Sequence, residues 1–212
     1  MAKRGKFIVV DGINACGKTT QIKNLWDLIY VENNIPLITT FEPNEKISDY
    51  GKKAREILKS VGDPYSKAIE AIEAFSKDRN NHNKSFAHNL SDGYYVLTGR
   101  YWYSTFAYQH AQCVSYKNIA ENNKGLIVPD LTLILDVTVE ESWRRRRKEK
   151  RRKFDSDYDF MESVRKNYLE LPTILPKLMN DSSIRVIDGM GTEDEVWERI
   201  HNVVKKEDIL TT

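Results

Sequence analysis

The segment from Gly12 to Thr19, near the N-terminus, carries residue types that bind phosphate. Its sequence, Gly12-Ile13-Asn14-Ala15-Cys16-Gly17-Lys18-Thr19, fits the pattern G-x-x-x-x-G-K-[ST] without a gap. The glycines let the backbone turn so that successive N–H groups point at an anion, while the lysine reaches the outer phosphates. The Thr19 hydroxyl is suited to ligate Mg²⁺. The segment therefore predicts a nucleoside triphosphate site, to which we add the flanking Asp11 and Thr20.

The flanking sequence favours this interpretation over a glycine-rich turn that fits the pattern by chance. Residues 6–10 are an apolar, β-branched run, which predicts a buried strand. Residues 18–30 place Ile22, Leu25 and Ile29 on one helical face. A strand, a glycine-bounded loop and a helix in this order are the context that the motif requires.

The rest of the chain alternates between predicted strands and predicted helices. Further strands are expected at residues 36–40, 94–98, 131–137 and 184–189. Helices are expected at residues 51–59, 65–90, 104–112, 115–122, 140–153, 156–171 and 193–205, with a short separate piece between Pro172 and Pro176. This alternation predicts an α/β fold of the P-loop NTPase type, in which a five-stranded parallel sheet carries helices on both faces. No linker-like composition divides the chain, so we expect one domain over residues 1–212.

The composition excludes several classes of protein. The 212 residues are 40% hydrophobic and 30% charged, which is typical of globular proteins. The net charge of +2 is too small to predict a nucleic-acid partner. Cys16 and Cys113 do not make a disulfide framework, and no run approaches the roughly 20 apolar residues of a membrane span. We therefore expect a cytoplasmic protein that binds neither nucleic acid nor membranes.

Six stretches of the chain follow a known set of motifs in order. Residues 11–21 are similar to E-G-I-D-G-x-G-K-[ST]-T-Q, Phe41-Glu42-Pro43 to R-E-P, and residues 51–58 to G-x-x-I-R-x-x-L. Phe75-Ser76-Lys77-Asp78-Arg79 is similar to F-A-A-D-R, and residues 99–109 to D-R-[YF]-x-x-S-[TN]-x-A-Y-Q. Residues 129–137 follow P-D-L-T-[LI]-x-L-D-V almost letter for letter. Together these motifs resemble the thymidylate kinases, the nucleoside monophosphate kinases that phosphorylate dTMP.

The resemblance implies a reaction and a set of site residues. The reaction would be phosphoryl transfer from ATP to dTMP, with Mg²⁺ as cofactor, in a homodimer. Lys18 and Arg100 would act on the phosphates, with Arg55 as a helper. The nucleoside pocket would be lined by Glu42, Phe75, Arg79, Thr105, Tyr108 and Gln109. Without the resemblance, the spacing of Phe75 and Arg79 favours a core phenylalanine beside a surface arginine.

Residues 144–153 form a densely basic run that has three interpretations. A charge run is by default a solvated helix face. The run could also bind nucleic acid, but no aromatic residue is interleaved within it. The resemblance favours a third interpretation, a lid over about residues 144–155 that closes arginines over the transferring phosphoryl group. Because the phosphate loop has no arginine of its own, we expect Arg147 and Arg151 to be catalytic, with Lys153 as a further candidate.

Three positions depart from the family's motifs and leave the acceptor open. Gly99 stands where the family has an aspartate that supports Mg²⁺ or orients the acceptor phosphate, and Phe41 replaces an arginine. Asn14 replaces the aspartate that accepts from the sugar 3′-hydroxyl. The carboxylates that remain near strand ends, and could support the metal, are Asp11, Glu42 and Asp136. The alternatives are therefore a kinase for another nucleotide or a deoxynucleoside, and a nucleotide-binding module with reduced catalysis.

Overall fold

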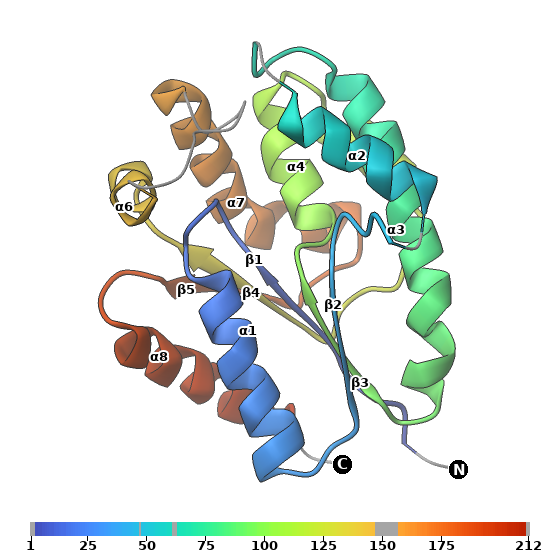
Figure 1. The fold of residues 1–212 in the computed structure, drawn as a ribbon, viewed down its shortest axis with the longest axis vertical. Coiled ribbons are helices and arrows are strands. Elements are labelled where there is room, and N and C mark those ends of the chain that lie inside the picture. Colours follow the sequence, from blue (N-terminus) through green and yellow to red (C-terminus); the bar gives the residue numbers. More distant parts are fainter. Residues whose placement is uncertain (1–2, 47, 61–62, 147–156, 211–212) are drawn as a thin grey trace.

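A single parallel sheet organises the protein (Figure 1). The computed structural model describes residues 3–46, 48–60, 63–146 and 157–210. The five strands are β1 (Phe7–Asp11), β2 (Leu37–Phe41), β3 (Tyr95–Gly99), β4 (Leu131–Asp136) and β5 (Ile184–Asp188). All neighbouring strands pair in parallel, in the order β2-β3-β1-β4-β5, which confirms the predicted α/β fold.

The helices cover both faces of this sheet. Their bounds are α1 (Lys18–Trp26), η1 (Asp27–Glu32), α2 (Asp49–Lys59), α3 (Ala68–Ser91), α4 (Trp102–Ala111), α5 (Tyr116–Asn122), α6 (Val139–Arg145), α7 (Tyr158–Leu178) and α8 (Glu193–Lys206). Parallel strands are joined by right-handed crossovers, so the direction of each step along the sheet decides the face on which its helix lies. The step from β1 to β2 runs opposite to all later steps, which separates α1 from α3, α4 and α7. The last helix, α8, packs beside α1.

The predicted end of the helix before Pro172 was wrong. Helix α7 runs without a break through Pro172 and Pro176, where we expected a helix ending at residue 171 and a separate short piece. A proline inside a helix removes a hydrogen bond and costs about 3 kcal/mol or more. Leu171 and Leu175 lie one turn apart and are both fully buried, so packing against the core outweighs this cost. Near the N-terminus, the α-helical part of the first helix ends at Trp26, and a π-helical turn continues it.

The central strands of the sheet lie within the core. Their carboxyl ends lie at one edge of the sheet. Every residue of β1 and β3 is buried, as expected for strands that are covered on both faces. Asp11, Phe41, Gly99 and Asp136 end β1, β2, β3 and β4. In open α/β sheets ligands bind outside this edge, so these four positions locate the region in which a site is expected.

Two further findings bear on the predictions from composition. Cys16 is buried, Cys113 is exposed, and both are free. None of the helices in the described ranges is long and apolar enough to span a bilayer.

Candidate active site

The phosphate loop connects β1 to α1 and has the backbone that its glycines predict. Gly12 has a φ of 138° and Gly17 a φ of 103°, both in the region that favours glycine. At Gly12 a Cβ would lie only 2.5 Å from the carbonyl oxygen of Leu135, so no larger residue fits there. The loop therefore depends on both glycines for its shape, and Gly17 immediately precedes the first residue of α1.

The Lys18 side chain folds back over the loop. Its Nζ donates to the carbonyl oxygens of Gly12 at 3.0 Å and Ile13 at 2.8 Å, and it lies 3.4 Å from Sγ of Cys16. Burial lowers the pKa of the Lys18 ammonium below its ordinary value, against the opposing effect of nearby Cys16 and Asp11. An anion in the loop would favour the charged form of this lysine.

A donor cavity opens in front of the phosphate loop. Thr19 and Thr20 line it at the start of α1, together with residues from α6 and from the segment between β5 and α8. The lining residues outside the loop and α1 are Phe41, Glu42, Arg55, Gly99, Arg100, Glu141, Arg144, Arg145, Gly189, Gly191, Thr192, Glu193 and Val196. The predicted residues from Asn14 to Thr20 line this cavity, whereas Asp11, Gly12 and Ile13 do not, and Asp11 is fully buried.

Arg145 is a residue of the donor cavity that the sequence did not single out within the basic run. Its Nη2 donates to the carbonyl oxygen of Gly189 at 2.9 Å, and its Nε donates to Glu141 at 2.6 Å. A weaker contact of 3.4 Å joins its Nη1 to the carbonyl oxygen of Ala15. Arg145 therefore links α6, the phosphate loop and the end of β5 at the mouth of the cavity.

A second cavity, the acceptor cavity, lies beside the first. All eight predicted acceptor residues line it, and they are Glu42, Arg55, Phe75, Arg79, Arg100, Thr105, Tyr108 and Gln109. They come from the segment after β2, from α2 and α3, and from the end of β3 and α4. The two cavities share Asn14, Glu42, Arg55 and Arg100, so these residues lie where the cavities meet.

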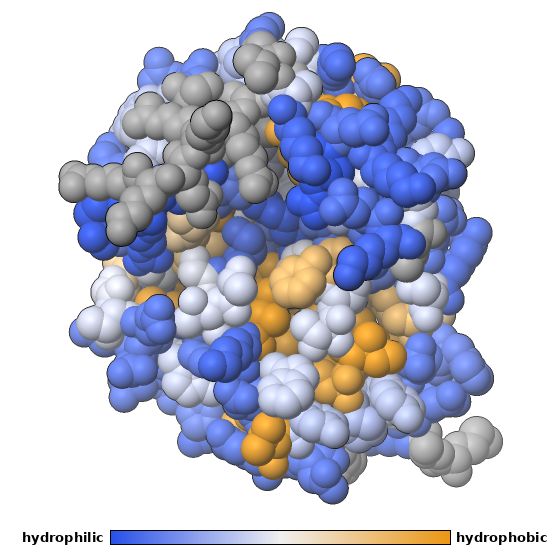
Figure 2. All heavy atoms as spheres, in the orientation of Figure 1, coloured by the Kyte–Doolittle hydropathy of each residue, from blue (hydrophilic) through white to orange (hydrophobic). Residues whose placement is uncertain are grey.

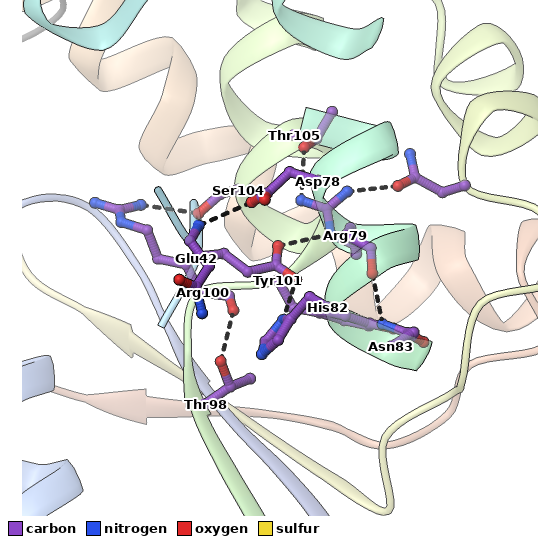
Figure 3. Close-up of polar contacts among 12 residues, drawn as sticks. Glu42, Asp78, Arg79, His82, Asn83, Thr98, Arg100, Tyr101, Ser104 and Thr105 are labelled. Carbon is purple, nitrogen blue, oxygen red and sulfur yellow. Dashed lines mark hydrogen bonds and ion pairs between the residues drawn. The ribbon is translucent and has the colours of Figure 1, made fainter. Parts of the chain in front are cut away.

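Arg79 is buried at the back of the acceptor cavity, so the simpler interpretation of a surface arginine was wrong. Only 1% of the residue is exposed. Its Nε donates to Glu42 at 2.8 Å, Nη1 donates to Asn123 at 2.5 Å and Nη2 donates to Thr105 at 3.2 Å (Figure 3). Three elements distant in sequence thus fix the guanidinium.

Glu42 has a second partner that the sequence did not reveal. His82, one helical turn after Arg79 on α3, places Nδ1 3.0 Å from the Glu42 carboxylate and Nε2 2.8 Å from the Thr40 hydroxyl. Both side chains are nearly inaccessible to solvent. No metal-ligand spacing accompanies His82 in the sequence, and only the fold brings it to the end of β2.

Arg100 occupies the boundary between the cavities in a left-handed backbone conformation, with a φ of 72°. Such a conformation is uncommon for a residue with a side chain and is concentrated at functional sites. Nη2 donates to Oδ1 of Asn14 at 2.6 Å and Nη1 donates to Oγ of Ser104 at 2.8 Å. The guanidinium also lies 5.9 Å from the centre of the Tyr108 ring. Asn14, which stands where the family has the aspartate that accepts from the sugar hydroxyl, accepts from Arg100 in this structure.

Asp11 is buried at the end of β1, and its hydrogen bonds link this end to the residues that follow β3. Its carboxylate accepts from the backbone N–H groups of Gly12, Tyr101 and Ser104 and from the Ser104 hydroxyl. The Tyr168 hydroxyl, from α7, donates to it at 2.9 Å. Burial, and next the charge of Asp11, raise the pKa of Tyr168 well above its ordinary value, so the phenol stays a neutral donor.

Three comparisons with known proteins agree with this geometry. The family model described as Thymidylate kinase matches residues 10–200. The chain is 33% identical over 210 residues to "Probable thymidylate kinase" of Pyrococcus horikoshii, which covers 96% of this chain and 98% of that one. It is 35% identical over 214 residues to "Thymidylate kinase" of Sulfurihydrogenibium, which covers 97% and 100%.

The chain belongs to the thymidylate kinase family. A solved structure titled as thymidylate kinase from Candida albicans matches its fold with a TM-score of 0.80, covering 100% of this chain and 96% of that one. Because the sequence identity of that pair is 23%, this match bears on the fold alone.

The three carboxylates named as candidates to support a metal in this thymidylate kinase family member are engaged by other groups. The Asp11 carboxylate already accepts the hydrogen bonds described above, and the Glu42 carboxylate is bound by Arg79 and His82. Asp136 is bound by both Nε and Nη2 of Arg165, at 2.7 and 2.9 Å. Within the described residues, no group of three or more acidic, histidine or cysteine side chains is arranged to hold a metal ion.

A magnesium ion bound together with a nucleotide still fits this donor set. Mg²⁺ at phosphate-transfer sites keeps several waters and is held largely by substrate phosphates. The Thr19 hydroxyl, at the first turn of α1 and on the donor cavity, is the oxygen ligand that the motif supplies. Thr19 is accordingly the residue of this chain that would hold the metal.

The predicted lid arginines lie outside the described residues. Arg147, Arg151 and Lys153 all fall within residues 147–156, of which the structure gives no description. The described flanks of this segment contact one another, because the Tyr158 hydroxyl of α7 bonds to Glu140 of α6. The rings of Trp143 and Tyr158 pack edge to face with centroids 5.5 Å apart. The described residues on the two sides of this segment, at α6 and at the start of α7, are therefore in contact with each other.

Proposed function

We propose that this member of the thymidylate kinase family transfers the γ-phosphoryl group of ATP to dTMP, forming dTDP and ADP. The observation that carries the proposal is the shared boundary of the two cavities. Arg100 and Asn14 line both, so an acceptor phosphate beside Arg100 would face the terminal phosphate of a nucleotide in the phosphate loop. Family membership and the names of the relatives support dTMP as the acceptor.

On the donor side, the loop's N–H groups and Lys18 would hold the β- and γ-phosphates. The Lys18 ammonium would exchange the carbonyl oxygens of Gly12 and Ile13 for phosphate oxygens. Mg²⁺, with Thr19 as its ligand from the protein, would neutralise charge on the donor phosphates. No covalent intermediate on the protein is required, because positioning and electrostatic stabilisation supply the catalysis.

On the acceptor side, Arg100 would bind the phosphate of dTMP and Arg55 would assist it. A guanidinium presents a fixed fork of donors, and Arg100 is already oriented by Ser104 and Asn14. Phe75 would stack on the base and Arg79 would donate to a pyrimidine carbonyl oxygen. Because Arg79 is held by three partners, the base would meet a fixed donor rather than a mobile one.

The remaining parts of the proposal concern the lid, the domain organisation, the cellular location and the number of subunits. We assign a lid to about residues 144–155, with Arg147 and Arg151 stabilising the transferring phosphoryl group, within one domain over residues 1–212. We also propose a cytoplasmic homodimer. Sedimentation equilibrium of the purified protein tests the dimer, and a species of about 24.7 kDa, the mass of one chain, would refute it.

A panel of acceptors tests the function. ADP release is measured with dTMP, dUMP, dCMP and thymidine, each with ATP and Mg²⁺. Fastest turnover with dTMP is the expected result. Faster turnover with another nucleotide or with thymidine would replace the proposed acceptor, and nucleotide binding without turnover would identify a binding module.

A further inference from the structure

Two of the departures from the family's motifs are in contact with each other. Phe41 ends β2 and Gly99 ends β3, and the two are register partners in the sheet. A Cβ added at Gly99 would lie 2.5 and 2.8 Å from Cδ1 and Cε1 of the Phe41 ring, and 3.0 Å from Cδ1 of Ile22. Real Cβ atoms essentially never approach other atoms to less than 3.0 Å. The ring of Phe41 therefore occupies the space that any side chain at position 99 would need.

This contact lies on the wall of the donor cavity. Phe41 and Gly99 line that cavity together with Thr19 and Thr20, and neither lines the acceptor cavity. Phe41 is 48% exposed, although the cavity is otherwise lined mostly by loop backbone and polar side chains. Hydrophobic side chains gather on this face of the molecule between α1 and β2 (Figure 2). On the β2 side, the donor cavity thus presents the ring of Phe41.

The carboxylates of the donor cavity lie elsewhere or are already bound. Glu42 is paired with Arg79 and His82, and Glu141 accepts from Arg144 and Arg145. The third carboxylate on this cavity, Glu193, begins α8 after β5, at the opposite edge of the sheet from β2. Among the described residues around the cavity, the β2 side offers no carboxylate that is not already in an ion pair.

We propose that Phe41 and Gly99, which are in contact, together form one side of the donor cavity. This pair determines how the chain binds the metal ion of its donor nucleotide. Phe41 is a positioning residue whose ring closes the β2 side of the cavity. The cation is held through Thr19 and the nucleotide's own phosphate oxygens, with no carboxylate from the end of β3. The proposal rests on the donor half of the proposed function and is independent of which acceptor is used.

A direct consequence is that a carboxylate cannot be added at position 99 by one substitution. In Gly99→Asp the new Cβ meets both the Phe41 ring and Cδ1 of Ile22, so the ring must move. Because Phe41 lines the donor cavity, we expect the displaced ring to take room from the nucleotide. When Phe41→Ala is combined with Gly99→Asp, the carboxylate has the vacated space and faces the cation near Thr19.

A set of single and double variants tests this coupling. Gly99→Ala and Gly99→Asp are each made alone and with Phe41→Ala. ADP affinity is measured by calorimetry in Mg²⁺, and Mn²⁺ affinity of the ADP complex is measured by electron paramagnetic resonance. Tyr30→Ala is the matched control, because Tyr30 is an aromatic residue with the same 48% exposure but lines neither cavity.

The expected results separate the steric effect from the charge effect. Gly99→Ala weakens ADP binding about tenfold when Phe41 is intact, a magnitude typical of overpacking, and has almost no effect in the Phe41→Ala background. Gly99→Asp tightens Mn²⁺ about tenfold only in the Phe41→Ala background, because a hard cation gains an oxygen ligand. The Tyr30→Ala variant leaves both affinities unchanged.

Three results would overturn the proposal. The first is an equal loss of ADP affinity from Gly99→Ala whether or not Phe41 is replaced by alanine. The second is tighter Mn²⁺ binding in Gly99→Asp with Phe41 intact. The third is unchanged Mn²⁺ affinity when Gly99→Asp is combined with Phe41→Ala. Folding of each variant is checked by thermal unfolding and by dTMP binding, since the acceptor cavity excludes both residues. A failure of dTMP to bind any variant or the parent protein would count against the proposed acceptor and would leave the ADP and Mn²⁺ measurements interpretable.

Discussion

Replacing Arg79 by methionine should destabilise the fold as well as the acceptor cavity. The Arg79 and Glu42 side chains are 2% and 4% exposed, and their charged atoms lie 2.8 Å apart. Methionine keeps much of the arginine's length but removes the charge and the three hydrogen bonds to Glu42, Asn123 and Thr105. The Glu42 carboxylate is then buried with His82 as its remaining partner.

The magnitude follows from this burial. Removing one partner of a buried ion pair costs about 3–5 kcal/mol, because the other charge remains in a poorly solvating environment. Since His82 still contacts Glu42, the lower end, about 3 kcal/mol, is expected here. For a chain of this size each kcal/mol lowers the melting temperature by about 2–4 °C, so Arg79→Met should melt about 6–12 °C below the parent protein.

Thermal unfolding by circular dichroism measures the effect, and Lys77→Met is the control. Lys77 lies on the same helix two residues earlier and pairs with Glu73 at 2.6 Å, but both side chains are about half exposed. Breaking such a surface pair costs about 0–1 kcal/mol. Glu42→Gln in the Arg79→Met background should recover part of the loss, since it removes the uncompensated charge. An Arg79→Met protein that melts within the range of the Lys77→Met control would refute the reasoning.

Four other predictions concern the phosphates. Lys18→Ala should abolish transfer while circular dichroism shows a retained fold, and turnover near that of the parent protein would show that the phosphate-loop assignment is wrong. Burial lowers the pKa of Lys18, and the charge of a bound phosphate would raise it again, so ADP binding at pH about 9.5 should be accompanied by proton uptake. Calorimetry in buffers of different ionisation enthalpy measures this uptake, and Lys18→Ala should remove it. Arg147→Ala with Arg151→Ala should lower kcat by about two orders of magnitude in the coupled ADP assay, with a smaller change in dTMP affinity; a loss of binding to single-stranded DNA with unchanged turnover would favour the nucleic-acid interpretation. Arg100→Lys should weaken dTMP binding about tenfold or more, because an ammonium cannot keep the fork toward Ser104 and Asn14, and equal affinity in a calorimetric titration would contradict this.

The alternation of strands and helices, the phosphate loop and the family could all be predicted from local sequence. Strand β4 is a continuous apolar run, and its burial on both faces follows from that pattern. The glycines of the phosphate loop have the positive φ angles that only glycine adopts without strain. Such features depend on residues close together in the chain, so their sequence specifies them directly.

Helix continuity was less predictable, because it is decided by packing. Pro172 and Pro176 predict interruptions from their local chemistry, and the structure instead continues α7 through both. The burial of Leu171 and Leu175 beside these prolines is a property of the assembled core, which local propensity does not contain.

The contacts within the site were decided by the tertiary structure alone. Sequence motifs named Arg79 and Glu42, but only the fold joins them across 37 positions and adds His82 between Glu42 and Thr40. Tyr168 reaches Asp11 across 157 positions, and nothing near either residue in the sequence signals it.

The contact between two departures from the family's motifs was also decided by the tertiary structure. The sequence shows Phe41 and Gly99 as two separate differences, 58 positions apart by their residue numbers. In the sheet they are register partners, and the ring of one fills the space above the other. Sequence determined which residue types are available at the carboxyl edge of the sheet, because strand and loop patterns are local. Which of them touch was decided only by folding, because parallel strands bring together residues that are remote in the chain.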